Sequence, residues 1–367
     1  MLAKSLSLLA LTVLLAACQV QADETKTITA KDSQAATSTA ARATQAASEA
    51  STDVEEDPRL KRLIGQPGPA VILQSLTGGP INLSDLYGKK PVYLKMWASY
   101  CIPCRAQMPK FGKIYEEMGD RMEIIAVNAG IGDDAQKISK FAAQTKLHVP
   151  IAIDDGSLSA WMQMQGTPVH LVIGRDGRVI FSGQGDGPEL DAALQQALDS
   201  KPASGAIQTS PTRQLASLKQ GDLIPEINVT LPNGSPSTLA ASSTGKPRAL
   251  LFTAIWCEDY LKEMEPQTSA NCTRLRQDFN TLSKKGDVQW SGVVTHLWTT
   301  PQGLSEYQQK TQQQQPYVLD SEGKAFQLFG IRRFPAVALI DAQGRLQRIV
   351  GPEDKDLTQA VAKLAQQ

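Results

Sequence analysis

Two pairs of cysteines are the residues in this chain whose types and spacing could do chemistry. Cys101 and Cys104 stand in the segment "MWASYCIPC", with two residues between them. Cys257 follows an aromatic residue in "AIWC", but the next cysteine, Cys272, comes only after "EDYLKEMEPQTSAN". A disulfide requires Cα atoms about 4.4–6.8 Å apart. The fold must therefore bring each pair together, and in the second pair it must do so across an intervening segment.

The first pair lies where a strand is expected to pass into a helix. The apolar run at 91–97 predicts a buried strand, and the amphipathic stretch at 104–118 predicts the helix. The Cys101 thiol then sits at a helix N-terminus, where the macrodipole and the free N–H groups favour thiolate. Cys104 follows one turn later and is close enough to form a disulfide with it. This arrangement predicts a redox-active dithiol.

A structural zinc half-site is the alternative for this pair, but the chain offers no second closely spaced cysteine pair and no histidine cluster to complete it. It contains three histidines, and they are far apart in sequence: His148, His170 and His296. We therefore expect no metal site and no cofactor.

The elements around the pair alternate between strands and helices. Further buried strands are predicted at 123–128, 151–154, 169–173 and 178–182, and further helices at 134–145 and 188–199. This pattern predicts an α/β fold in which a central sheet is flanked by helices.

The chain repeats itself internally. The same number of positions separates Gly65 from Cys101 and Gly221 from Cys257. Downstream, "GTPVHLVIGRDGRVIF" matches "RFPAVALIDAQGRLQRI", which starts at Arg333. Such self-similarity indicates two copies of one structural unit.

Composition completes the division of the chain. Residues 19–56 consist mainly of Ala, Thr, Ser and charged residues, with little to bury, which predicts a disordered tether. The predicted segments are a signal segment (1–18), this tether (19–56), a first domain with the CxxC pair (57–200), a linker (201–216) and a second domain with the separated cysteines (217–367).

The first eighteen residues have the pattern of an export signal. Lys4 precedes the apolar run "LSLLALTVLLAA", which is too short to span a bilayer as a helix. The run ends in "LAAC", which resembles the lipobox of bacterial lipoproteins and implies lipidation of Cys18. An ordinary signal peptide cut after Ala22 is the alternative. Both interpretations export the chain to a compartment where disulfides persist, and Gln19 after the cysteine resembles the outer-membrane sorting pattern.

The overall charge excludes one class of partner. Lys and Arg together number 37 and Asp and Glu together also number 37. With no net charge there is no electrostatic reason to expect nucleic acid as a partner.

"WASYCIPC" with the later "GTP" resembles the thioredoxin superfamily, and specifically the TlpA-type membrane-anchored thiol–disulfide oxidoreductases. The resemblance implies two tandem thioredoxin-like domains, each with a central mixed β-sheet flanked by helices. It also implies that Cys101 is the nucleophile, Cys104 the resolving thiol and Pro168 the cis-proline that faces them. Two positions depart from the family: Gln107 stands where relatives often carry Glu, and Lys95 where they carry Asp or Asn. Proton handling is therefore left open.

The second pair fits the repeat if about twelve residues were inserted between its cysteines. We then expect a helix to begin near Ser269 as N-cap, so that Cys257 and Cys272 meet, with Pro335 as the facing proline. The pair is either redox-active or a structural disulfide. The inserted residues 258–268 carry four acidic side chains against a single lysine, Lys262, which predicts that thiolate is disfavoured at Cys257.

These inferences predict an exported, lipid-anchored thiol–disulfide oxidoreductase in the bacterial envelope, facing the periplasm from the outer rather than the inner membrane. "CIPC" resembles the reducing members of the family, which implies protein disulfides as clients and a membrane electron donor of the thiol-relay type. For the second domain, the alternatives are a Sco-like copper-handling module that uses His296, a peroxiredoxin-like centre, or a binding module without redox activity.

Overall fold

Two runs of buried residues form the central strands of the molecule. "VYLKMW" forms β3 (Val92–Trp97), in which every residue is buried, and "RALLFT" forms β10 (Arg248–Thr253). The computed structural model describes residues 57–212, 214–239 and 245–366. The predictions for the signal segment, for Cys18 and for the tether fall outside these residues.

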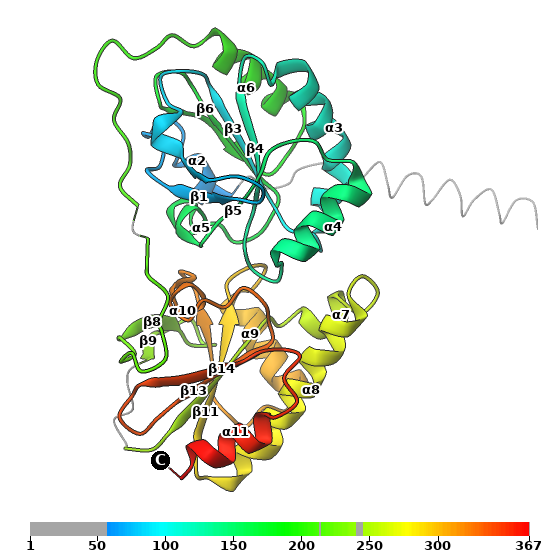
Figure 1. Ribbon diagram of the computed structural model, residues 1–367, viewed down its shortest axis with the longest axis vertical. Coiled ribbons are helices and arrows are strands. Elements are labelled where there is room, and N and C mark those ends of the chain that lie inside the picture. The colour runs from blue at the N-terminus through cyan, green and yellow to red at the C-terminus, as the bar shows by residue number, and fades with distance from the viewer. Residues whose placement is uncertain (1–56, 213, 240–244, 367) are drawn as a thin grey trace, which may run out of the picture. The chain divides into compact units, whose positions relative to one another are not determined.

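The elements that surround β3 make up what we call the first lobe (Figure 1). In chain order they are α2 (Pro58–Lys61), β1 (Ile72–Ser75), β2 (Pro80–Asn82), η1 (Leu83–Asp85), β3 (Val92–Trp97), α3 (Ile102–Met118), β4 (Glu123–Asn128), α4 (Ala135–Thr145), β5 (Ile151–Ile153), α5 (Ser157–Met162), β6 (Val169–Ile173), β7 (Val179–Gly183) and α6 (Pro188–Asp199).

The elements that surround β10 make up the second lobe (Figure 1). They are β8 (Ile227–Thr230), β9 (Pro236–Leu239), β10 (Arg248–Thr253), α7 (Cys257–Tyr260), α8 (Pro266–Leu282), η2 (Ser283–Lys285), β11 (Gln289–Thr295), α9 (Pro301–Lys310), β12 (Tyr317–Asp320), α10 (Lys324–Leu328), β13 (Ala336–Ile340), β14 (Leu346–Val350) and α11 (Leu357–Leu364).

The two lobes have the same sheet topology. Among the described residues the strands form two seven-stranded sheets, in the orders β2-β1-β5-β4-β3-β6-β7 and β9-β8-β12-β11-β10-β13-β14. In each, the central strand runs parallel to one neighbour (β3 with β4, β10 with β11) and antiparallel to the other (β3 with β6, β10 with β13). The predicted fold class, α/β with tandem thioredoxin-like domains and mixed sheets, is confirmed.

The strands and helices predicted around the first cysteine pair are present to within two residues at most boundaries. β1, β2 and α5 were not predicted from the sequence, because they are short and carry no long period of apolar residues. β1 pairs antiparallel with β5 through Gln74 and Ser75. This long-range pairing, rather than a local pattern, makes it a strand.

The two lobes share one buried cluster of apolar side chains. Tyr100 and Ile131 of the first lobe belong to the same cluster as Phe326 and Phe334 of the second. The part of the chain that the structure describes lies within one compact unit. None of the helices among these residues is both long and apolar enough to cross a membrane.

Candidate active site

The turn between β3 and α3 holds the first cysteine pair as a disulfide. Cys101 is the N-cap of α3, and the backbone N–H of Cys104 donates to its Sγ at 3.2 Å. The Cα atoms of the two cysteines are 5.2 Å apart. The first turn of this 17-residue helix carries no acidic side chain. After reduction, a Cys101 thiolate would therefore meet free N–H groups and the positive end of the helix dipole.

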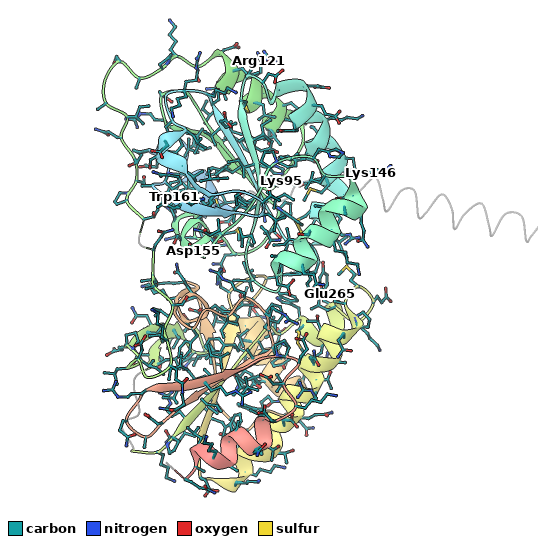
Figure 2. The ribbon with its side chains drawn as sticks, viewed as in Figure 1. Lys95, Arg121, Lys146, Asp155, Trp161 and Glu265 are labelled. Atoms are coloured by element: carbon teal, nitrogen blue, oxygen red, sulfur yellow. A yellow bond between two sulfur atoms is a disulfide. The ribbon has the colours of Figure 1, made fainter. Side chains whose placement is uncertain are left out.

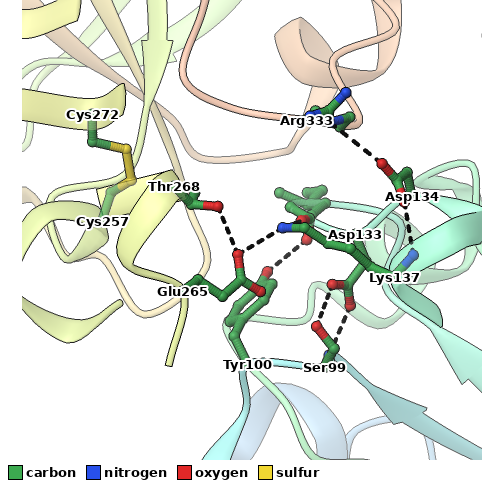
Figure 3. A network of polar contacts seen from close by, with 12 residues as sticks. Ser99, Tyr100, Asp133, Asp134, Lys137, Cys257, Glu265, Thr268, Cys272 and Arg333 are labelled. Carbon is green, nitrogen blue, oxygen red and sulfur yellow. Dashed lines mark hydrogen bonds and ion pairs between the residues drawn. A yellow bond between two sulfur atoms is a disulfide. The ribbon is translucent and has the colours of Figure 1, made fainter. Parts of the chain in front are cut away.

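A buried carboxylate fixes the backbone just before Cys101. Asp133 accepts hydrogen bonds from the backbone N–H of Ser99 at 2.7 Å and from the Ser99 hydroxyl (Figure 3). It also accepts one from Asn128 Nδ2 at 2.7 Å. Burial raises the pKa of Asp133, and the bonds from Ser99 and Asn128 act in the opposite direction. Asp133 was not predicted from the sequence, since nothing in a single chain marks an acid far from the cysteines as their support.

The loop before β6 faces the disulfide. The Cys101 Sγ lies 3.4 Å from the carbonyl oxygen of Thr167, and the peptide bond from Thr167 to Pro168 is cis. The loop that ends in Pro168 thus lies against the nucleophile candidate. Only 1% of Cys101 is exposed to solvent, and Cys104 is fully buried.

Lys95 and Gln107, the two residues that depart from the family pattern, contact each other. Lys95, labelled in Figure 2, lies on β3 with none of its surface exposed, and its ammonium group donates to Gln107 Oε1. His170 Nε2 is 3.5 Å from the Lys95 Nζ and 3.1 Å from the same Gln107 oxygen. The Tyr93 hydroxyl is 2.7 Å from the other ring nitrogen, Nδ1. Gln107 lies one turn beyond Cys104, so this polar cluster is on the inner side of α3.

Burial without a carboxylate partner changes the charge of this cluster. It lowers the pKa of Lys95 from 10.5 to about 7, and the negative charge of Asp186 offsets only part of that effect. Burial also places the pKa of His170 well below 6.5, with Lys95 and Lys110 adding to the effect. At neutral pH, therefore, His170 is neutral, and Lys95 loses its proton far more readily than an exposed lysine does.

The structure brings the second pair together as well. Cys257 and Cys272 form a disulfide with Cα atoms 6.2 Å apart (Figure 3). Cys257 is the first residue of the short helix α7, and Cys272 is in the second turn of α8. The inserted residues form α7 and a turn that leads back to α8, so the two sulfurs meet although their positions in the sequence are far apart.

The predicted start of the second helix is wrong. α8 begins at Pro266, and its N-cap is Glu265, four residues before the expected N-cap Ser269. Proline is favoured in the first turn of a helix because its missing N–H has no partner there in any case. Ser269 lies inside the helix, and its hydroxyl donates to the carbonyl oxygen of Glu258 at 2.6 Å. It thereby ties α8 to α7.

The acidic residues of the inserted segment are largely compensated, contrary to the expectation from sequence. The Glu258 carboxylate accepts from Arg276 Nε at 2.6 Å and from Nη2 at 2.9 Å, and also from the Thr273 hydroxyl. Asp259 pairs with Lys310 at 2.8 Å. The cations come from elements distant in sequence, so counting charges within the segment overstated the negative field at Cys257.

The facing loop of the second lobe lies beside the Cys257 turn. The peptide bond from Phe334 to Pro335 is cis. The Phe334 ring packs against that of Trp256, the residue before Cys257, with centroids 5.6 Å apart. The second lobe therefore has the same three parts as the first: a strand, a cysteine turn and a proline loop.

The copper-binding alternative receives no support from the geometry. His296 is buried, which lowers its pKa to about 4, and a Cβ added at Gly323 would lie 2.8 Å from its ring. Within the ranges that the structure describes, no group of three or more His, Cys, Asp or Glu side chains could hold a metal ion.

Comparison with known proteins agrees with this geometry. The Redoxin family matches residues 63–198, which is the first lobe. The chain is similar to the thiol–disulfide oxidoreductase ResA of Bacillus cereus, with 33% identity over 140 residues, 37% of this chain and 79% of ResA. It is similar to the thioredoxin-like protein YneN of Bacillus subtilis, with 33% identity over 114 residues, 31% of this chain and 66% of YneN, just under two thirds.

Among solved structures, the chain is similar to a putative thiol:disulfide interchange protein DsbE from Chlorobium tepidum. The identity is 28%, the TM-score is 0.34, and the match covers 37% of this chain and 97% of that one. The match to ResA covers more than two thirds of that protein, and the Redoxin match includes the cysteine turn and the proline loop described above. The chain belongs to the TlpA-type family of thioredoxin-like thiol–disulfide oxidoreductases.

Proposed function

We propose that this chain is an exported, lipid-anchored thiol–disulfide oxidoreductase that reduces disulfides in client proteins. The observation that carries the proposal is the Cys101–Cys104 disulfide at the start of α3, against the loop that ends in Pro168. The reducing direction is supported by the Ile102-Pro103 pair between the cysteines, which resembles the reducing members of the family.

The reaction proceeds by two thiol–disulfide exchanges. The Cys101 thiolate attacks one sulfur of the client disulfide, forming a mixed disulfide and releasing the first client thiolate. Cys104 then loses its proton and attacks the Cys101 sulfur. The mixed disulfide breaks, the second client thiolate leaves, and the Cys101–Cys104 disulfide forms. The client gains two electrons and the enzyme loses two, so a membrane dithiol donor must reduce the enzyme again.

We further propose that the functional parts follow the sequence division. Cys18 would carry the lipid, residues 19–56 would act as a tether, and two domains (57–200 and 217–367) would be joined by residues 201–216. The domains would face the periplasm, on the outer rather than the inner membrane. A Cys18→Ala variant would no longer be found in the membrane fraction but would keep its thiol activity in vitro. Continued membrane binding of the variant would contradict the lipid anchor.

The test of the main proposal is the capture of clients. In a Cys104→Ser variant the second exchange is blocked, so mixed disulfides on Cys101 accumulate in the native host and can be identified by mass spectrometry. A Cys101→Ser variant is the matched control and would capture none. If Cys104→Ser captures no protein, and the unmodified chain does not reduce insulin, the proposal is wrong.

Cys257–Cys272 is proposed as a second redox pair, with Pro335 as its facing residue. The support is that the second lobe repeats the strand, cysteine turn and proline loop of the first. If this pair resists reduction in the folded protein under conditions that fully reduce Cys101–Cys104, it is a structural disulfide instead.

A further inference from the structure

The two lobes contact each other through the same parts of their folds. The backbone N–H of Gly132, in the loop after β4, donates to the carbonyl oxygen of Arg332 at 2.7 Å. The backbone N–H of Trp298, in the loop after β11, donates to the carbonyl oxygen of Gln165 at 2.6 Å. β4 and β11 occupy the same place in their sheets. The two bonds are therefore equivalent: in one the first lobe donates to the second, and in the other the second lobe donates to the first.

The residues that accept these two bonds, and the aromatic rings beside them, also occupy equivalent positions in the two lobes. Gln165 and Arg332 each stand three residues before the cis-proline of their own lobe. Tyr100 and Trp256 each immediately precede the first cysteine of their lobe, and their ring centroids are 5.4 Å apart. A contact in which equivalent residues meet is the mark of an isologous interface, the kind that relates two identical subunits by a two-fold axis. Here it lies within a single chain.

This contact covers the cysteine turn of the first lobe. The Tyr260 hydroxyl, from α7, donates to the carbonyl oxygen of Tyr100 at 3.0 Å and accepts from the backbone N–H of Ile102 at 3.3 Å. It therefore binds the residues on both sides of Cys101. The Trp298 indole lies over the loop before Pro168, where a Cβ added at Gly166 would be 2.6 Å from its nitrogen.

Charged pairs lie at the edge of the same contact. Lys137 donates to Glu265 at 2.6 Å, and Arg333 is 3.4 Å from Asp134 (Figure 3). Lys137 also donates to the carbonyl oxygen of Gly132, whose N–H binds Arg332. The contact thus has aromatic side chains at its centre and charged pairs at its rim, which is the arrangement of a specific protein–protein interface.

We infer that the face of the first lobe around Cys101 is a protein-binding surface whose resident partner is the second lobe, and that a protein client must displace this lobe before Cys101 can attack. The inference rests on the proposed function. Exchange requires the Cys101 sulfur to reach a client sulfur. In the closed form Cys101 is buried, and Tyr260 of the second lobe is bonded to the residues on both sides of it. A small disulfide needs a smaller opening than a folded client, so closure discriminates by client size.

The test compares two disulfides in variants that loosen the contact. Tyr260→Phe removes both hydrogen bonds of the Tyr260 hydroxyl and keeps the aromatic ring. A double variant that also carries Trp298→Ala loses the indole that lies against Gly166. In a Cys104→Ser background, we follow formation of the mixed disulfide on Cys101 with insulin and with bis(2-hydroxyethyl) disulfide. Loss of one or two hydrogen bonds raises the open fraction by roughly 3- to 10-fold. We expect an increase of that size with insulin and a smaller one with the small disulfide.

Arg348→Ala is the matched control, because Arg348 pairs with Asp354 and Asp356 inside the second lobe; it would change neither rate. Amide hydrogen exchange of the peptide around Ile102 reports whether the contact has opened. Faster exchange with an unchanged insulin rate would overturn the inference, and so would unchanged exchange in the double variant. If the unmodified chain reacts with neither disulfide, the proposed function itself fails, which is a distinguishable result.

Discussion

The two cysteine turns occupy the same place in two sheets of the same topology, but their electrostatic surroundings differ. Cys101 caps a 17-residue helix and receives the Cys104 N–H directly. Cys257 starts a four-residue helix whose N-cap, Trp256, makes no side-chain cap. Cys272 is already inside α8. The helix N-terminus that favours thiolate is therefore available to Cys101 alone. A repeated fold position does not by itself repeat the reactivity.

The largest effect expected from this difference concerns catalysis. Cys101→Ser would lower insulin reduction by the full chain on the order of 100-fold or more, because no thiolate remains at the α3 N-terminus. Cys257→Ser with Cys272→Ser would leave most of the activity. The turbidity of precipitating insulin chains measures both rates. Comparable losses in the two variants would mean that the second pair takes part in every turnover.

Stability is expected to respond in the opposite order. Cys257–Cys272 closes a loop of 15 residues and Cys101–Cys104 a loop of 3. Chain entropy then predicts that removing the former disulfide lowers the free energy of unfolding by about 3 kcal/mol, and removing the latter by about half as much. Urea unfolding of the oxidised double-alanine variants measures both changes. Equal losses would contradict the view that the longer loop contributes more.

The buried lysine of the first lobe gives an effect on stability that depends on pH. Lys95 has a pKa of about 7 in the fold and 10.5 when unfolded, so between these values the unfolded chain binds the extra proton. The free energy of unfolding therefore rises with pH across this window, by up to about 1.4 kcal/mol per pH unit. Below pH 7 the destabilisation is complete and constant.

Lys95→Met removes this dependence. Urea unfolding at pH 7.5 to 9 would show the variant gaining stability over the unmodified chain, with the gain shrinking as pH rises. Lys110→Met, at a partly exposed side chain, is the control and would leave the slope unchanged. A pH-independent difference for Lys95→Met would mean that Lys95 keeps its ordinary pKa in the fold.

The smallest expected effect concerns the acidic residues of the inserted segment. Glu258→Gln weakens the bonds to Arg276 and Thr273 that hold α7 on α8. The lost free energy is roughly that of one hydrogen bond, so dithiothreitol would reduce Cys257–Cys272 a few-fold faster. Its neighbour provides the control. Asp259 and Lys310 are mostly exposed, at 80% and 71% of their side chains, so Asp259→Asn would leave the rate unchanged.

The sequence was sufficient for the central strands, the redox helix and the internal repeat, because each follows from a local period or a fixed spacing. It was not sufficient for β1, which is defined by its pairing with β5. The N-cap of α8 was misplaced because serine is a favoured N-cap residue, whereas Pro266, a start signal in a first turn, was not considered.

At the site, the cysteines could be named from their spacing and the prolines from the family resemblance and the internal repeat, whereas their supporting residues could not. Asp133 holds Ser99 from the loop after β4, and Tyr260 reaches Cys101's neighbours from the other lobe. Both contacts join residues distant in sequence. A single chain carries no local signal for them.

The segment that joins the lobes has a consequence for how closure depends on conditions. The Ser210 N–H donates to the carbonyl oxygen of Gly68 at 2.8 Å, and Gln214 Nε2 donates to that of Ile72 at 3.0 Å, so the connection follows the first lobe. By Leu218 the chain is already bonded to Leu328 of the second lobe. So short a free span keeps the second lobe at a high effective concentration near Cys101. Dilution, which would separate two independent chains, therefore leaves the closed fraction unchanged.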